Sequence, residues 1–177
     1  MKANRALSFS GMSVLILDDS DNMCRILARL LRSFGFEDFR IAHGGAEALQ
    51  LLQKHSVDLA VVDWHMEDLD GIEFSRQVRA RKTSPDPYLP IILLTAFTEL
   101  AQIKVAQDIG VNEILTKPVS PDALYGRLTS VVRKPRPYIE TAKYFGPDRR
   151  RRETPEFKGP HRRNGDAWWR NMASASG

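Results

Sequence analysis

Leu59-Ala-Val-Val-Asp-Trp-His-Met-Glu-Asp-Leu-Asp-Gly71 is the stretch of sequence that decides the fold. Residues 59–62 form an apolar run of strand length, Asp63 ends that run, and a segment with helical periodicity follows Gly71. A short apolar run bounded in this way predicts a buried β-strand. The stretch is therefore typical of a βα unit with a carboxylate at the C-terminal end of its strand.

The same alternation of strand and helix repeats along most of the chain. We predict strands at residues 14–17, 39–42, 59–62, 91–94 and 114–115. We predict helices at residues 21–34 and 45–54, from Gly71 onward, and at residues 99–109 and 121–132. Strands that alternate with helices indicate a parallel sheet with helices on both faces. We therefore expect an α/β domain, a doubly wound five-stranded parallel sheet, followed by a largely disordered arginine-rich tail.

Charge is divided unevenly along the 177 residues. Residues 1–132 contain 14 Lys and Arg against 17 Asp and Glu, whereas residues 133–177 contain 12 against 5. The net charge of +4 therefore combines an acidic body with a basic tail. The one cysteine, Cys24, cannot form an internal disulfide, and its place on a helical apolar pattern predicts a small buried side chain.

The sequence lacks the patterns of membrane and secreted proteins. No apolar run approaches the roughly 20 residues that a membrane-spanning helix needs. The N-terminus also lacks a charged and then apolar signal sequence. We therefore expect a cytoplasmic protein without membrane insertion.

Conspicuous polar residues stand at the C-terminal ends of four predicted strands. They are Asp18 and Asp19 after the first strand, Asp63 after the third, Thr95 after the fourth, and Lys117-Pro118 after the fifth. Ligands of open α/β sheets bind outside these strand ends. One such aspartate alone is more often a helix cap or a solvated loop residue. The recurrence of polar residues at four strand ends favours one common site.

The chemistry of this set indicates phosphoryl transfer. Carboxylates that converge repel one another and need a cation, and oxygen ligands in a small polar cleft suit Mg²⁺. Asp63 would be the nucleophile that takes a phosphoryl group, while the metal and Lys117 neutralise the phosphoryl oxygens. Thr95 would hydrogen-bond the transferred group. We also expect a cis peptide bond before Pro118, which would direct Lys117 inward.

Together with residues 63–71, this set resembles the flavodoxin-like receiver domain of CheY-type response regulators, over residues 12–132. The resemblance implies a signalling protein rather than an enzyme, phosphorylated at Asp63 by a histidine kinase. It implies Asp19 as a direct Mg²⁺ ligand, Asp18 as a ligand through water, and the backbone carbonyl of His65 as a further ligand. Thr95 would be the switch hydroxyl and Lys117 the lysine of the family pattern.

Two positions depart from the pattern of that family. The residue three before Lys117 is normally an aromatic that swings inward on phosphorylation, and here it is Ile114. Glu67 stands where the family usually has proline. The phosphorylation pocket is therefore complete in sequence, whereas the usual aromatic switch is replaced.

The basic tail contains a duplicated segment. Tyr144-Phe-Gly-Pro-Asp-Arg-Arg-Arg-Arg152 is followed by Phe157-Lys-Gly-Pro-His-Arg-Arg-Asn164. Guanidinium groups bind phosphates and guanine edges through paired hydrogen bonds, and aromatic rings stack on bases. The alternative is a solvated basic tail without a specific ligand.

A receiver followed by this duplicated segment resembles the Cle proteins, which are CheY-like effectors with an arginine-rich extension. The resemblance implies binding of cyclic di-GMP, as one molecule or as an intercalated dimer, and engagement of a flagellar motor switch protein. The expected nucleotide-binding residues are Tyr144, Gly146, Asp148, Arg149, Arg150, Arg151, Arg152, Phe157, Gly159, His161, Arg162, Arg163 and Asp166. The tail would become ordered on binding, and the protein would be recruited to the flagellated pole.

We divide the chain into an N-terminal lead (1–11), a receiver domain (12–132), a linker (133–143), the duplicated nucleotide-binding segment (144–166) and a C-terminal tail (167–177). Trp168 and Trp169 in that tail would either stack on a base or dock the tail on the receiver. We expect a monomer that does not bind nucleic acid. The alternative is a phosphorelay receiver that accepts a phosphoryl group on Asp63, with a tail that binds nucleic acid or membrane nonspecifically.

Overall fold

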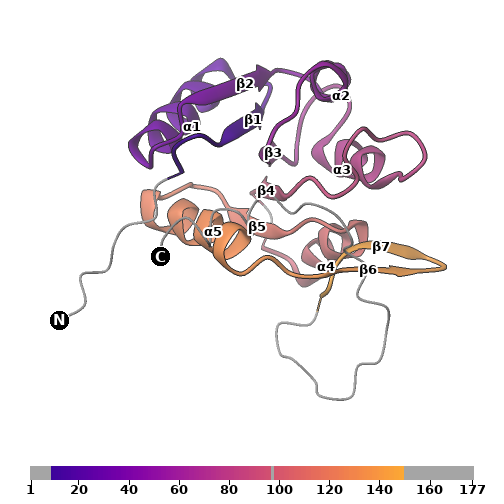
Figure 1. The fold of residues 1–177 in the computed structure, drawn as a ribbon. Helices are drawn as coiled ribbons and strands as arrows, with labels where there is room; N and C mark the ends of the chain where they lie inside the picture. The colour runs from indigo at the N-terminus through magenta and orange to yellow at the C-terminus, as the bar shows by residue number, and fades with distance from the viewer. Residues whose placement is uncertain (1–8, 97, 150–177) are drawn as a thin grey trace, which may run out of the picture.

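The computed structural model describes residues 9–96 and 98–149 and contains a central parallel sheet. Its strands are β1 (Ser13–Leu17), β2 (Asp38–Ala42), β3 (Leu59–Asp63), β4 (Ile91–Thr95) and β5 (Glu113–Thr116). They lie in the order β2-β1-β3-β4-β5, and every neighbouring pair is parallel. The predicted doubly wound α/β fold is confirmed (Figure 1).

Five helices cover the two faces of this sheet. They are α1 (Asp21–Ser33), α2 (Gly45–Lys54), α3 (Gly71–Arg79), α4 (Leu100–Ile109) and α5 (Pro121–Arg133). One apolar core lies between the sheet and α1 with α5, and the other between the sheet and α2, α3 and α4. Alternate β1 residues enter opposite cores, Ile16 the first and Leu17 the second, because successive strand side chains point to opposite faces.

Local signals in the sequence define the helix ends. Ser20 caps α1 by accepting a hydrogen bond from the Met23 amide, and Asp70 caps α3 through the Glu73 amide. Gly110 ends α4 with φ of +95°, a left-handed conformation that favours glycine. The predicted ends of these helices differ from the observed ones by only a residue or so, as expected for frayed helix termini.

The chain continues beyond α5 into a β-hairpin. Strands β6 (Tyr138–Thr141) and β7 (Tyr144–Pro147) pair antiparallel and lie beside α4 (Figure 1). Residues 138–143, within the span that we expected to be a linker (133–143), thus belong to this hairpin, and β7 forms the start of the arginine-rich segment. The sequence did not indicate the hairpin because each strand has only four residues, and their stabilising contacts come from distant parts of the chain.

The described residues contain no helix that is both long enough and apolar enough to cross a bilayer.

Candidate functional site

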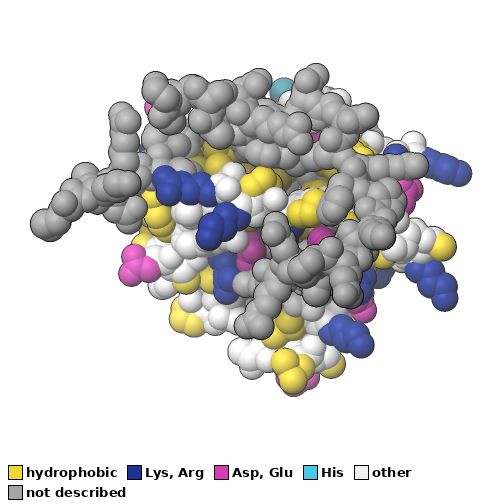
Figure 2. Space-filling model, turned by 60° about the horizontal axis from the view of Figure 1, so that its bottom comes forward, with side chains coloured by type: hydrophobic (Ala, Val, Ile, Leu, Met, Phe, Trp, Pro, Cys, Tyr) yellow, Lys and Arg dark blue, Asp and Glu magenta, His cyan; other side chains and the backbone are white. Residues whose placement is uncertain are grey.

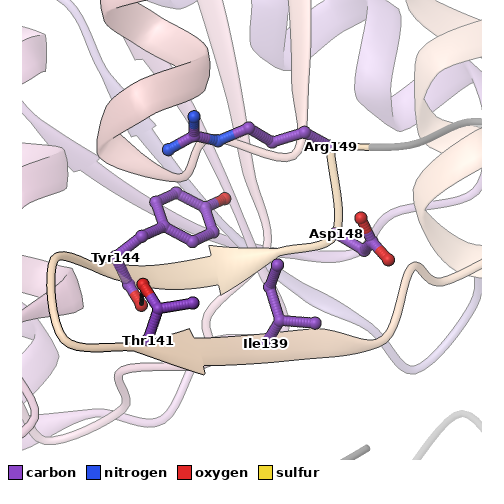
Figure 3. Close-up of a pocket in the computed structure, with 5 residues that line it drawn as sticks. All are labelled: Ile139, Thr141, Tyr144, Asp148 and Arg149. Atoms are coloured by element: carbon purple, nitrogen blue, oxygen red, sulfur yellow. Dashed lines mark hydrogen bonds between the residues drawn. The ribbon is translucent and has the colours of Figure 1, made fainter. Parts of the chain in front are cut away.

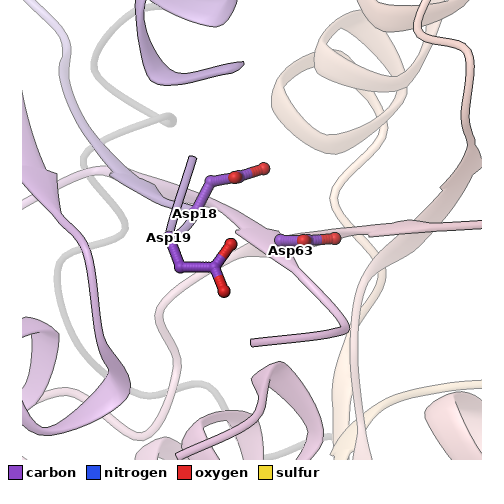
Figure 4. A group of neighbouring side chains, drawn as sticks. All are labelled: Asp18, Asp19 and Asp63. Atoms are coloured by element: carbon purple, nitrogen blue, oxygen red, sulfur yellow. The ribbon is translucent and has the colours of Figure 1, made fainter. Parts of the chain in front are cut away.

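Three carboxylates meet at the C-terminal edge of the sheet. Asp18 and Asp19 follow β1, and Asp63 is the last residue of the neighbouring strand β3. One oxygen from each lies within 4.8 Å of the other two, as Figure 4 shows. Asp18 and Asp63 are buried, whereas Asp19 is exposed. This arrangement of oxygen donors, partly open to solvent, fits a hard divalent cation such as Mg²⁺.

Lys117 reaches the same place from the end of β5. Its Nζ donates to Asp63 Oδ1 at 2.8 Å and lies 3.5 Å from Asp18 Oδ2. The Lys117–Pro118 peptide bond is cis, as the sequence predicted. Lys117, just after the strand two places from β3 in the sheet, therefore brings a cation to two of the three carboxylates.

Burial and charge act in opposite directions on the ionisation of this cluster. Burial raises the pKa of Asp18 above its usual value, although the Ser20 amide and Lys117 oppose this. Burial alone would lower the pKa of Lys117, but the hydrogen bond and charge of Asp63, with the charge of Asp18, raise it. Lys117 therefore remains protonated at neutral pH and keeps its positive charge beside Asp63 and Asp18.

Backbone contacts hold the remaining predicted site residues nearby. Thr95 is buried at the end of β4, one residue beyond the partner of Asp63 in the strand register. Its carbonyl accepts from the Lys117 amide at 2.7 Å. In the loop after β3, which contains His65, the Glu67 amide donates to Asp19 Oδ2 at 3.3 Å. The structure thus brings together the strand-end residues that the sequence singled out.

Gly71 is a site residue whose role the sequence analysis missed. A Cβ at this position would lie 2.1 Å from the Asp63 carbonyl oxygen, far closer than atoms can approach. The absence of a side chain lets the first turn of α3 pack directly against the backbone of Asp63. In the sequence, the feature that could have indicated this role is the position of Gly71 at the end of the loop that follows Asp63.

Ile114 lies in β5 opposite Leu93 and packs, half-buried, against the core on the α2, α3 and α4 side. It therefore occupies the position predicted for the missing aromatic switch, on the strand that carries Lys117. No aromatic ring is present there to rotate between an exposed and a buried state.

Cys24 provides a test of the packing beside the acidic cluster. Its side chain is only 2% exposed, and its Sγ donates to the Asp18 carbonyl at 3.2 Å. Burial, with the nearby charge of Asp18, raises the pKa of Cys24 from 9.0 to about 11. We expect iodoacetamide to alkylate the folded protein at pH 8 about 100-fold more slowly than the urea-unfolded chain, because thiolate is the reactive form.

The alkylation rate of folded protein should rise about tenfold per pH unit until the thiol ionises. Mass spectrometry after timed quenching measures both rates. Equal rates for the folded and unfolded chain at pH 8 would show that Cys24 is not in this environment.

Three of the predicted nucleotide-binding residues line a hollow on the hairpin. Tyr144, Asp148 and Arg149, with Ile139 and Thr141, border a cavity of about 380 Å³ (Figure 3). The Arg149 guanidinium lies 4.0 Å from the centre of the Tyr144 ring. Burial raises the pKa of Tyr144 against the opposing effect of Arg149, so its hydroxyl remains protonated and donates to the Pro147 carbonyl.

Gly146 packs closely against the receiver. It is buried, and a Cβ there would lie 2.8 Å from the Gly110 Cα and 2.7 Å from the Tyr144 hydroxyl. The missing side chain therefore allows the hairpin to contact the end of α4. The sequence alone does not reveal this contact with Gly110.

The other predicted tail residues lie outside the described part of the chain. They are Arg150, Arg151, Arg152, Phe157, Gly159, His161, Arg162, Arg163, Asp166, Trp168 and Trp169.

The fold and this site define a class of protein, the response regulator receivers. Residues 14–129 match the response regulator receiver domain family, and the chain belongs to that family as a CheY-like receiver of two-component signalling. A chemotaxis protein CheY homolog of Campylobacter jejuni is 36% identical over 122 residues, which cover 68% of this chain and 92% of that protein.

Two solved structures share the fold and cover 68% of this chain. CheY4 of Vibrio cholerae has a TM-score of 0.62 and 29% identity, with 98% of that chain covered. The receiver domain of a Pseudomonas aeruginosa sensor histidine kinase has a TM-score of 0.60 and 25% identity, with 96% covered. The latter was solved with magnesium coordinated in its active-site cleft.

Proposed function

We propose that this receiver binds cyclic di-GMP through its arginine-rich C-terminal segment and then engages a flagellar motor switch protein. The observation that carries this proposal is the Tyr144–Arg149 stack beside Asp148, at the edge of a cavity of about 380 Å³. This size lies within the range of about 300–1,000 Å³ that is usual for small-ligand pockets.

The chemistry of the stack matches that of the proposed ligand. Cyclic di-GMP has two guanines and two phosphates, and arginine binds both groups while an aromatic ring covers a base. Arg149 opens the first of the two arginine clusters. A repeated motif therefore suits a ligand with two equivalent ends, or an intercalated pair of such ligands.

The position of the hairpin brings the proposed ligand close to helix α4, whose surface would bind the motor switch protein. Arg149 donates to Asp108 of α4 at 2.6 Å, so the start of the arginine cluster lies on the receiver. A ligand that draws Arg149 away from Asp108 would change the surface that α4 presents. Recruitment to the flagellated pole would follow from binding of the motor switch protein to that changed surface.

Calorimetry with cyclic di-GMP tests the binding step. We expect micromolar or tighter affinity for the full chain and a loss of about 10-fold or more in Arg149→Ala, because a charge-assisted hydrogen bond contributes about 1.5–3 kcal/mol. Arg76→Ala, which removes an exposed arginine of α3 paired with Glu73, is the matched control and should bind normally.

The double variant Arg150→Ala with Arg163→Ala removes one matching arginine from each copy of the motif. The proposal fails if the wild-type chain does not bind, or if this double variant and Arg149→Ala both retain full affinity.

The acidic cluster supports a second candidate, a phosphorelay receiver in which the tail is a bystander. The contact of Lys117 with Asp63 at 2.8 Å favours it, since this pair is arranged to accept a phosphoryl group. A chain that ends at Arg149 retains the docked hairpin and is the appropriate deletion. Loss of function in that chain, with full function in Asp63→Asn, would exclude the relay.

A tail that binds nucleic acid or anionic lipid by bulk charge is distinguished by scrambling residues 150–177 at constant composition. Bulk binding would survive the scrambling, whereas binding of a defined nucleotide would not.

A further inference from the structure

We propose that the receiver itself forms part of the nucleotide site, through a cleft between the β6–β7 hairpin and the face formed by α4, β5 and α5. This inference rests on the proposed function. It assigns to Arg136 and Arg127, which lie outside the duplicated motif, the binding of a phosphate of cyclic di-GMP.

The cleft is distinct from the hollow described above but shares a wall with it. Its volume is about 370 Å³, and both cavities are bordered by Tyr144 and Arg149. The stacked pair therefore borders two spaces of similar size. A ligand with two bases could place one base in each.

Apolar side chains of the receiver line part of the cleft. Ile103 of α4 and Ile114 of β5 are half-buried there, opposite Tyr144 and Pro147 of the hairpin. A flat base inserted between these groups would bury apolar area on one side and contact an aromatic ring on the other. Ile114 would thus provide apolar contact area for the base, which the aromatic usual at this position would provide differently.

Three arginines border the same cleft, and their partners leave it with an excess of positive charge. Arg149 pairs with Asp108 at 2.6 Å, and Arg127 donates to Glu113 at 3.2 Å. Arg136 donates to the Asp148 carbonyl at 3.1 Å, and no described carboxylate forms an ion pair with it. A guanidinium with remaining donors, next to two others, favours a phosphate.

The surrounding surface has a matching character. Figure 2 shows the side of the molecule that lies toward the bottom of Figure 1, where Lys and Arg side chains lie among hydrophobic and acidic ones. A surface that mixes positive and apolar groups suits a nucleotide, whose phosphates meet the positive groups and whose flat bases meet the apolar ones. An all-acidic peptide would suit it less well, because its carboxylates offer no flat apolar ring.

Calorimetry with the full chain tests this assignment. We expect Arg136→Gln to weaken cyclic di-GMP binding about 10-fold, with partial rescue in Arg136→Lys because lysine keeps the charge but loses the paired donors. Arg76→Gln on α3 is the matched control. Arg127→Gln is less informative, since Glu113 is buried and would lose a partner.

Methyl NMR of the wild-type chain gives a second measurement that does not depend on a variant. Addition of cyclic di-GMP should shift the Ile103 and Ile114 methyl signals, and leave Ile41, which is exposed on the far edge strand β2, unchanged.

The outcomes separate this inference from the function on which it rests. If the wild-type chain binds cyclic di-GMP while Arg136→Gln binds equally well and neither cleft methyl shifts, the inference is wrong and the proposed function stands. If the wild-type chain does not bind, both fail. Shifts of Ile103 and Ile114 with a poly-glutamate peptide but not with the nucleotide would overturn it in favour of a protein partner.

Discussion

The Asp63→Asn variant gains no phosphoryl group from acetyl phosphate under conditions in which the wild-type chain is labelled. In the expected reaction, an Asp63 carboxylate oxygen would attack the phosphorus of the donor, the bond from phosphorus to the acetate oxygen would break, and acetate would leave with its electron pair. A side-chain amide cannot form this acyl phosphate. We expect labelling at least about 100-fold below that of wild type, since loss of a nucleophile removes the reaction path.

Intact-mass spectrometry measures the phosphoryl group, and Asp122→Asn is the matched control. Asp122 is an exposed aspartate in the first turn of α5, and its loss should leave labelling unchanged. Chelation of Mg²⁺ with EDTA should suppress labelling of the wild-type chain, because Asp18, Asp19 and Asp63 are arranged to hold a cation. Labelling of Asp63→Asn at the wild-type level would show that another residue accepts the phosphoryl group.

The Tyr138→Ala variant loses about 3 kcal/mol of unfolding free energy, near the lower end for truncation of a large aromatic side chain in a core. Tyr138 is only 3% exposed, and its hydroxyl donates to the Tyr88 carbonyl at 2.8 Å. Its ring lies 5.3 Å from the guanidinium of Arg79, which is itself buried and donates to Asn112 Oδ1 at 3.0 Å. We choose the lower end because a two-stranded hairpin outside the central sheet can detach before the receiver unfolds.

Urea denaturation measures this loss, and amide hydrogen exchange shows where it occurs. Tyr138→Phe keeps the ring and removes only the hydroxyl, so it should lose about 1 kcal/mol, the usual contribution of one hydrogen bond. The amides of β6 and β7 should exchange faster in Tyr138→Ala than in Tyr138→Phe. A Tyr138→Ala variant with wild-type stability and a protected hairpin would show that this tyrosine does not anchor the extension.

Short-range patterns were sufficient to predict the receiver. The runs that became β1, β3 and β4 are continuous apolar segments, and the residues after them are the ones that meet at the sheet edge. Parallel strands must present their C-terminal ends on one side, so the sequence alone predicts that Asp18, Asp63 and Lys117 lie together. The departure at Ile114 was equally visible, because it depends only on its spacing from Lys117.

The hairpin could not be predicted in the same way. Tyr138 is anchored by Tyr88, 50 residues earlier, and Gly146 requires the bare backbone of Gly110. Nothing in residues 138–147 alone indicates these partners, since a pair of four-residue strands is marginal without packing.

The sequence by itself determined the sheet, its helices and the clustering of Asp18, Asp63 and Lys117 at the sheet edge, because local periodicity and the geometry of parallel strands suffice for those. Only the tertiary structure decided where the start of the arginine-rich extension packs against the receiver. Its contacts with Arg79, Asp108 and Gly110 join segments about 30 to 60 residues apart in the chain, and no local pattern within the extension specifies such partners.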